Sequence, residues 1–245
     1  ADVLRLWVAA TDYSAEMSVS EEVFKRVSES YRRIRNTCRY LLANLDGFTP
    51  DMAVPQAQLL AIDQWVLDQA QQLQTQVETA YENYQFHQVY QQVHEFCSVK
   101  LGSLYLDVLK DRMYTLKLDS VARRSGQTAM FHVIHALVRW IAPILSFTAE
   151  EIWRYIPGTP AQTGGLGSVF VASWYRDLPA LPANAALNAK DFALLGELRE
   201  LTTKALEPLR ATKLIGSGLD ARLNIYVGDQ AKARIDKLSD ELRFY

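Results

Sequence analysis

The sequence of 245 residues contains little cysteine and no long apolar run. Its two cysteines, Cys38 and Cys97, are too few and too far apart for a disulfide framework or a zinc knuckle. We expect both to be buried thiols of a cytoplasmic protein, because a reducing compartment disfavours disulfides. No stretch approaches the roughly 18 apolar residues of a membrane span. Residues 1–5 also lack the layout of a signal peptide. The sequence predicts a protein with no membrane partner.

The sequence also lacks the short motifs of common catalytic sites. It has no Gly-x-Ser-x-Gly segment, no Walker-type loop and no dinucleotide fingerprint, and residues 164–167 (GGLG) predict a flexible loop. No Glu has a His three residues later, although metal-binding helical bundles pair such segments. His132 and His135 could share a helix face, but two ligands do not make a zinc site. We therefore expect no catalytic residue, no metal and no cofactor here.

Positive charge is unevenly distributed, although the net charge is only -2. Residues 21–45 hold six basic and three acidic side chains, and residues 110–124 hold five basic and two acidic ones. On a helix, Lys25, Arg32, Arg35 and Arg39 would form one ridge beside the apolar stripe. Such ridges can clamp phosphates. The same pattern is typical of a solvated helix face with ion pairs, and charge alone does not separate the two interpretations.

Up to about residue 156 the sequence predicts helices. Apolar residues recur at steps of three and four, and Gly and Pro are sparse. Ser18 and Glu21 predict a capping box that starts a helix ending at residues 46–47, and a second box at residues 148–151 would start a short helix after Pro143. Between these, the pattern predicts helices over about residues 59–84, 86–108 and 120–142.

The composition then changes. Four of the eight prolines and four of the eleven glycines fall between residues 157 and 182, which indicates a domain boundary or a long surface loop. A short strand is expected at residues 168–171. A helix over about residues 190–215 would contain Pro208, at a cost of about 3 kcal/mol or with a kink. Residues 219–227 alternate as in a half-buried strand, and a helix over residues 230–242 follows.

Five separated motifs carry a family resemblance. They are residues 2–13 (DVLRLWVAATDY), 31–45 (YRRIRNTCRYLLANL), 96–99 (FCSV) with 105–112 (YLDVLKDR), 123–128 (RRSGQT) and 142–153 (APILSFTAEEIW). In this order they resemble class I aminoacyl-tRNA synthetases for isoleucine, valine and leucine, and the second motif is most similar to the isoleucine enzymes. The chain thus resembles the anticodon-binding and adjoining C-terminal region of bacterial-type isoleucyl-tRNA synthetases.

This resemblance implies a mainly α fold, a helical anticodon-binding bundle followed by a small, truncated α/β unit. It implies four segments: residues 1–17, a connector from a catalytic domain; residues 18–156, the anticodon-binding domain; residues 157–186, a Gly/Pro-rich loop with a short strand; and residues 187–245, the start of a C-terminal α/β region. The catalytic signatures, the editing domain and the Cys ligands of the family's zinc module are absent from the sequence. Pro208 and the long loop depart from the family's pattern.

The resemblance also implies a function. The family's full enzyme attaches isoleucine to its tRNA with ATP, magnesium and zinc, and this part would hold the tRNA as a cytoplasmic monomer without its own activity. Lys110 is expected to contact an anticodon base, with Arg112, Arg123 and Arg124 beside it, while Arg32, Arg35 and Arg39 hold the RNA backbone.

Structural and functional alternatives remain. Arg112 and Arg124 could instead pair with Asp107 or Asp119 and tie helices together. The rival functions are a helical protein-interaction module, marked by an exposed apolar patch, and a stand-alone enzyme.

Overall fold

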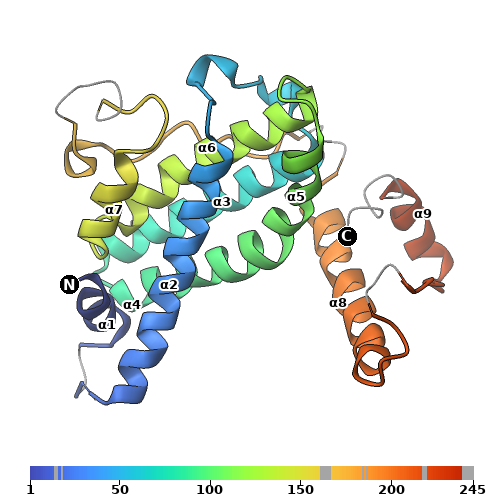
Figure 1. Ribbon diagram of the computed structural model, residues 1–245, viewed down its shortest axis with the longest axis horizontal. Helices are drawn as coiled ribbons and strands as arrows, with labels where there is room; N and C mark the ends of the chain where they lie inside the picture. Colours follow the sequence, from blue (N-terminus) through green and yellow to red (C-terminus); the bar gives the residue numbers. More distant parts are fainter. Residues whose placement is uncertain are drawn as a thin grey trace. The chain divides into compact units, whose positions relative to one another are not determined.

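The chain forms two compact units, Ala1–Pro182 and Ala183–Tyr245. The computed structural model describes residues 1–13, 16–17, 19–160, 167–183, 185, 187–216 and 220–238. Throughout these ranges the regular structure is helical and no strand occurs, which confirms the mainly α class (Figure 1). None of the helices in these ranges is both long and apolar enough to cross a membrane.

The first unit is a bundle of helices of unequal length. Its elements are α1 (Asp2–Ala10), α2 (Glu21–Asn44), η1 (Pro50–Met52), η2 (Gln56–Gln58), α3 (Ala61–Glu82), α4 (Phe86–Glu95), η3 (Phe96–Tyr105), α5 (Leu106–Thr115), α6 (Val121–Ile141), α7 (Ser146–Trp153) and η4 (Val169–Val171). Helices α3 and α6 pack against each other, and α2 packs on α6. Trp140 of α6 is fully buried, and its indole N–H donates to Gln74 of α3 at 3.1 Å. These contacts confirm the helices expected from the apolar periodicity.

Helix α2 carries the first basic segment. Its N-cap is Ser20, whose hydroxyl accepts from the backbone N–H of Val23 at 3.2 Å. The capping residue expected from the sequence, Ser18, lies outside the described residues. The helix ends before a turn in which Gly47 has a φ of 69°. A side chain at that position would be strained, so glycine allows the chain to leave the helix here.

The helix expected over residues 86–108 is continuous but not uniform. Between α4 and α5, residues Phe96–Tyr105 form a π-helix, η3, and the helical run continues to Thr115. A Cβ atom on Gly102 would lie 2.9 Å from the carbonyl oxygen of Cys97, so the wide turn depends on glycine. Such turns shift the buried face of a helix. In η3 the shift buries Tyr105 against α3.

Helix α7 receives its cap from α1, so the capping box predicted at residues 148–151 is wrong. The helix begins at Ser146, and its N-cap residue, Leu145, makes no capping bond from its side chain. The Asp2 carboxylate instead accepts from the backbone N–H groups of Phe147 at 3.3 Å and Thr148 at 2.7 Å. An anionic cap at a helix start is favourable. Local sequence cannot reveal a cap supplied by so distant a residue.

The strand predicted at residues 168–171 is also wrong. Val169–Val171 form the single turn η4, and the backbone N–H of Val169 donates to the Glu150 carboxylate at 3.2 Å. The residues that follow are held by side chains instead of by a neighbouring strand. The carbonyl of Ser173 accepts from Arg139 at 2.8 Å, and the carbonyl of Tyr175 accepts from Gln74 at 2.7 Å.

The second unit contains α8 (Ala189–Ala211) and α9 (Asp229–Lys237). Asn188 and Asp191 form a capping box at the start of α8, and the helix runs through Pro208. Asp191 also accepts from Lys237 at 2.6 Å, which joins the two helices.

The strand predicted at residues 219–227 is wrong wherever the structure describes it. Leu219 lies outside the described residues, and residues 221–228 have no regular structure. Leu223 and Ile225, expected on a buried face, are 48% and 45% exposed. Alternation alone does not make a strand when no neighbour provides hydrogen bonds. The helix expected over residues 230–242 starts at Asp229 and runs to Lys237, and residues 239–242 lie outside the described residues.

Candidate nucleic-acid interface

The seven basic residues predicted to bind RNA come from three helices of the first unit. Arg32, Arg35 and Arg39 lie on α2, Lys110 and Arg112 on α5, and Arg123 and Arg124 on α6. Their surroundings differ strongly, so they do not form one equivalent set of RNA contacts.

The three α2 arginines are exposed or half-buried. Arg32 pairs with Glu29 on its own helix at 3.3 Å, and both side chains are more than half exposed. Arg39 is exposed, and it forms no ion pair or hydrogen bond within the described part of the chain. Exposed pairs along a helix contribute little. Arg32 and Arg39 could therefore turn toward a phosphate at small cost.

Arg35 is held by a two-pronged ion pair to α7. Two of its guanidinium nitrogens donate to the two Glu151 oxygens, each at 2.7 Å. These bonds raise the pKa of Arg35 further above its ordinary value and lower the pKa of Glu151. Bidentate pairs of this kind fix geometry as well as charge. Arg35 therefore joins α2 to α7 in addition to any contact with RNA.

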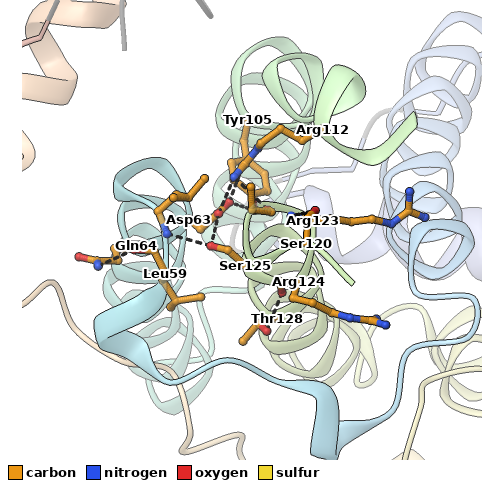
Figure 2. Close-up of polar contacts among 12 residues, drawn as sticks. Leu59, Asp63, Gln64, Tyr105, Arg112, Ser120, Arg123, Arg124, Ser125 and Thr128 are labelled. Carbon is orange, nitrogen blue, oxygen red and sulfur yellow. Dashed lines mark hydrogen bonds and ion pairs between the residues drawn. The ribbon is translucent and has the colours of Figure 1, made fainter. Parts of the chain in front are cut away.

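Arg112 is buried, in contrast to the exposed site that an RNA contact needs. Its guanidinium donates to both oxygens of Asp63 on α3, at 2.8 and 2.9 Å. Tyr105 and Ser125 donate their hydroxyl protons to the same carboxylate, at 2.7 and 2.5 Å (Figure 2). The Arg112 side chain is 9% exposed and that of Asp63 is fully buried. This arrangement supports the structural alternative for Arg112, with Asp63 as a partner that the sequence reasoning missed.

Arg123 and Arg124 leave the first turn of α6 and are half-buried. Arg123 donates to the main-chain carbonyl of Met113 at the end of α5. Arg124 donates to Gln127 at 2.8 Å, and Gln127 in turn donates to the carbonyl of Asn44 at the end of α2 at 3.0 Å. Arg123 directly, and Arg124 through Gln127, thus connect the start of α6 to the ends of other helices. Figure 2 shows both side chains extending away from Asp63 and its hydrogen-bond donors.

Lys110 lies on the exposed side of α5. Its ammonium pairs with Asp107 at 2.9 Å, and the side chains are 54% and 46% exposed. Burial first, then the neighbouring Tyr114 hydroxyl and the Asp107 charge, raise the pKa of Tyr40 on α2. Asp107 therefore lies near α2, close to the residue that follows Arg39.

A groove of about 1070 Å³ lies beside this ridge. Arg35, Asn36 and Arg39 of α2 line one side, and Glu151, Ile152 and Tyr155 line another. The turn after α2 and residues 157–158 complete it. Sequence reasoning did not find the groove, because its walls are far apart in the chain: Arg35 and Glu151, which join them, are separated by 116 residues.

His132, His135 and the two cysteines make packing contacts and hydrogen bonds within the bundle. His132 shares a hydrogen bond of 2.6 Å with the Tyr175 hydroxyl, and His135 stacks on the same ring at 5.1 Å. Burial lowers the pKa of His135 to about 3. Cys38 and Cys97 are confirmed as buried thiols, and burial raises the pKa of Cys38 to about 12. Within the described ranges no three His, Cys, Asp or Glu side chains are grouped closely enough to hold a metal ion.

Comparison with known proteins identifies the family. The family described as "Anticodon-binding domain of tRNA ligase" matches residues 63–225, more than half of the chain. Proteins named isoleucine-tRNA ligase align with the whole chain: those of Nitrosococcus oceani and Methylococcus capsulatus at 53% identity, and that of Thioalkalivibrio sulfidiphilus at 55%. The chain spans 25–26% of the length of these relatives. With its helical bundle and the basic surface of α2, the chain belongs to the family of anticodon-binding domains of tRNA ligases.

Proposed function

We propose that the chain recognises the anticodon arm of isoleucine tRNA, as part of a longer ligase that attaches isoleucine to that tRNA. The observation that carries this proposal is the alignment of the whole chain with isoleucine-tRNA ligases at 53–55% identity. The exposed basic side chains of α2, together with Lys110 of α5, support it, since phosphates are bound by such groups. The alternative of a protein-interaction module has no support from the family match.

The role proposed for each basic residue follows from how exposed its side chain is. Lys110 is held only by a half-exposed ion pair, so it can be released to contact a base edge of the anticodon. Arg32 and Arg39 would hold phosphates. Arg123 and Arg124 would shape the start of α6, in line with the bond of Arg123 to the end of α5 and that of Arg124 to Gln127, which in turn bonds the end of α2. Arg112 would act indirectly, because its buried pair with Asp63 fixes α5 on α3.

The chemistry of the proposed longer ligase requires groups that this chain does not supply. Activation of isoleucine would use ATP and magnesium, and the family's zinc module needs cysteine ligands. The role proposed for this chain is to hold and select tRNA. We propose a monomer that acts in the cytoplasm.

Binding of two tRNAs at several salt concentrations tests the proposal. The chain should bind isoleucine tRNA more tightly than valine tRNA, and the affinity for both should fall as salt rises, by a slope of about 0.7–0.9 per phosphate contact. It should catalyse no ATP-pyrophosphate exchange above a control without protein. Absence of salt-dependent tRNA binding would favour a scaffold, and turnover by the chain itself would favour a stand-alone enzyme.

A further inference from the structure

The groove between α2 and α7 has features that phosphate binding alone does not explain. Its volume of about 1070 Å³ is slightly above the range of small-molecule pockets, about 300–1,000 Å³. Tyr155, which lines it just after α7, is 65% exposed although the ring is largely apolar. An exposed aromatic ring that lines a large groove can stack with a planar group of a ligand.

The walls of the groove are fixed by contacts within the bundle. The Arg35–Glu151 pair ties the α2 side to the α7 side with two bonds of 2.7 Å. At the other end, Gly158 has a φ of 76°, and a Cβ atom there would lie 2.6 Å from the ring of Pro50. This close approach holds the chain after α7 against the chain after α2. The groove is therefore formed before any ligand arrives, which reduces the entropy lost on binding.

The charges in the groove argue against a simple phosphate site. Its lining contains two arginines and two carboxylates, Arg35, Arg39, Glu151 and Asp46, so their formal charges sum to zero. Arg35 and Glu151 neutralise each other. Arg39 can bind one phosphate, whereas the exposed Asp46 carboxylate would repel a second. Among the described residues that line it, the groove is neutral and has one available cation, which suits a single nucleotide better than a run of backbone phosphates.

We propose that this groove receives one unstacked nucleotide of a single-stranded RNA segment, with its base stacked on Tyr155 and its phosphate bound by Arg39. The proposal rests on the proposed function, because it concerns the same tRNA-binding surface, and it adds a base-binding subsite and a new contact residue. Stacking on an aromatic side chain tolerates every base, since each base has a π-face. Tyr155 would therefore supply affinity, while the choice among tRNAs is left to Lys110.

Substitution of Tyr155 tests the proposal directly. Tyr155→Leu should weaken binding of the isoleucine tRNA anticodon stem-loop about 5- to 150-fold, the effect of losing one stacked base. Tyr155→Phe keeps the ring and should stay within about twofold of the unaltered protein. The matched control is Phe147→Leu, because Phe147 lies on α7, is 67% exposed and does not line the groove. That control should also stay within about twofold.

Two further measurements separate stacking from charge. Tyr155→Leu removes no charge, so the salt slope should be unchanged, whereas Arg39→Ala should lower it by about 0.7. A single-stranded seven-nucleotide RNA should compete with the stem-loop better than a duplex of the same length, and Tyr155→Leu should remove this preference. Circular dichroism verifies that the variants remain folded.

The outcomes are distinguishable from failure of the proposed function. If Tyr155→Leu changes affinity no more than Phe147→Leu, while Lys110→Ala still reduces discrimination between tRNAs, the base-binding groove is wrong and anticodon recognition stands. If the unaltered protein binds no tRNA, both proposals are overturned. If Tyr155→Phe weakens binding as much as Tyr155→Leu, the hydroxyl rather than the ring makes the contact, and the stacking proposal is overturned.

Discussion

At the scale of single residues, the Asp63 carboxylate is the main polar contact inside the bundle. It accepts four hydrogen bonds from three side chains, Arg112, Tyr105 and Ser125 (Figure 2). These donors belong to α5, to η3 and to α6, so one buried carboxylate joins three segments to α3. A buried charge is tolerated only when its pairing is this complete.

Removal of the Asp63 carboxylate should therefore be strongly destabilising. Asp63→Ala leaves the Arg112 guanidinium buried without its carboxylate partner. This should lower the free energy of unfolding by about 3–5 kcal/mol. Urea unfolding followed by tryptophan fluorescence is a suitable measurement, because all five tryptophans lie in residues 1–182. The control is Glu78→Ala, which breaks the more exposed pair with Arg176 and should cost no more than about 1 kcal/mol. Equal losses for the two variants would contradict the account.

The buried His135 predicts a dependence of stability on pH. Burial first, with help from Arg139 and His132, lowers its pKa from 6.5 to about 3. Between these values the unfolded chain binds a proton that the folded chain does not, so stability falls as the pH drops below about 6.5. Between pH 7.5 and pH 5, this single group should lower the free energy of unfolding by about 2 kcal/mol.

The same unfolding measurement at pH 7.5 and pH 5 checks this effect. His135→Gln removes the titrating group and should show a smaller loss between the two pH values than the unaltered protein. Carboxylates with lowered pKa values, such as Glu151, add their effect at lower pH. The same loss in both proteins would show that His135 is not responsible.

Sequence reasoning identified the basic residues but not the state of each one. Arg112 and Lys110 are two positions apart on one helix, yet one is buried and the other is 54% exposed. The difference depends on Asp63, which is 49 residues away from Arg112. An Asp within the apolar stripe of α3 was a signal that could have been used. Its partners could not be chosen from sequence, because the π-helix before α5 changes which face is buried.

At the scale of elements, helix positions followed from apolar periodicity, whereas the helix ends and strands depended on distant contacts. The predicted helix over residues 120–142 corresponds closely to α6, Val121–Ile141. The start of α7 depends on Asp2, and the segment after residue 168 depends on side chains of α3, α6 and α7. Strands were predicted at residues 168–171 and, from alternation, at residues 219–227, but neither segment has a neighbouring strand to pair with in the described residues.

The connection after α7 makes an element-scale prediction. Gly158→Ala introduces a side chain at positive φ and places its Cβ atom 2.6 Å from Pro50. The matched control is Gly47→Ala, which also has positive φ but no heavy atom within 4 Å. In urea unfolding, Gly158→Ala should therefore lower the free energy of unfolding by at least about 1 kcal/mol more than Gly47→Ala does. Equal costs would show that the contact with Pro50 does not constrain the groove.

At the scale of the whole molecule, the proposed function requires a bundle of modest net charge to select RNA. The net charge of -2 gives no general attraction to nucleic acid. Under the proposed function, selection must therefore come from local basic groups, the exposed arginines of α2 and Lys110 of α5. The family and its fold could be inferred from ordered motifs in the sequence, because such motifs do not depend on knowing which side chains are exposed.

The most direct test of this central claim compares Lys110→Ala with Arg39→Ala. Arg39 is the better phosphate control, since removing Arg35 would also release Glu151. The measurement is the affinity of each variant for isoleucine tRNA and valine tRNA at fixed salt. We expect Lys110→Ala to weaken the binding of isoleucine tRNA by about 1–3 kcal/mol and the binding of valine tRNA by less. We expect Arg39→Ala to weaken the binding of both tRNAs equally and to lower the dependence of affinity on salt. Equal weakening of both tRNAs by Lys110→Ala would contradict the assignment of Lys110 as the base-reading residue.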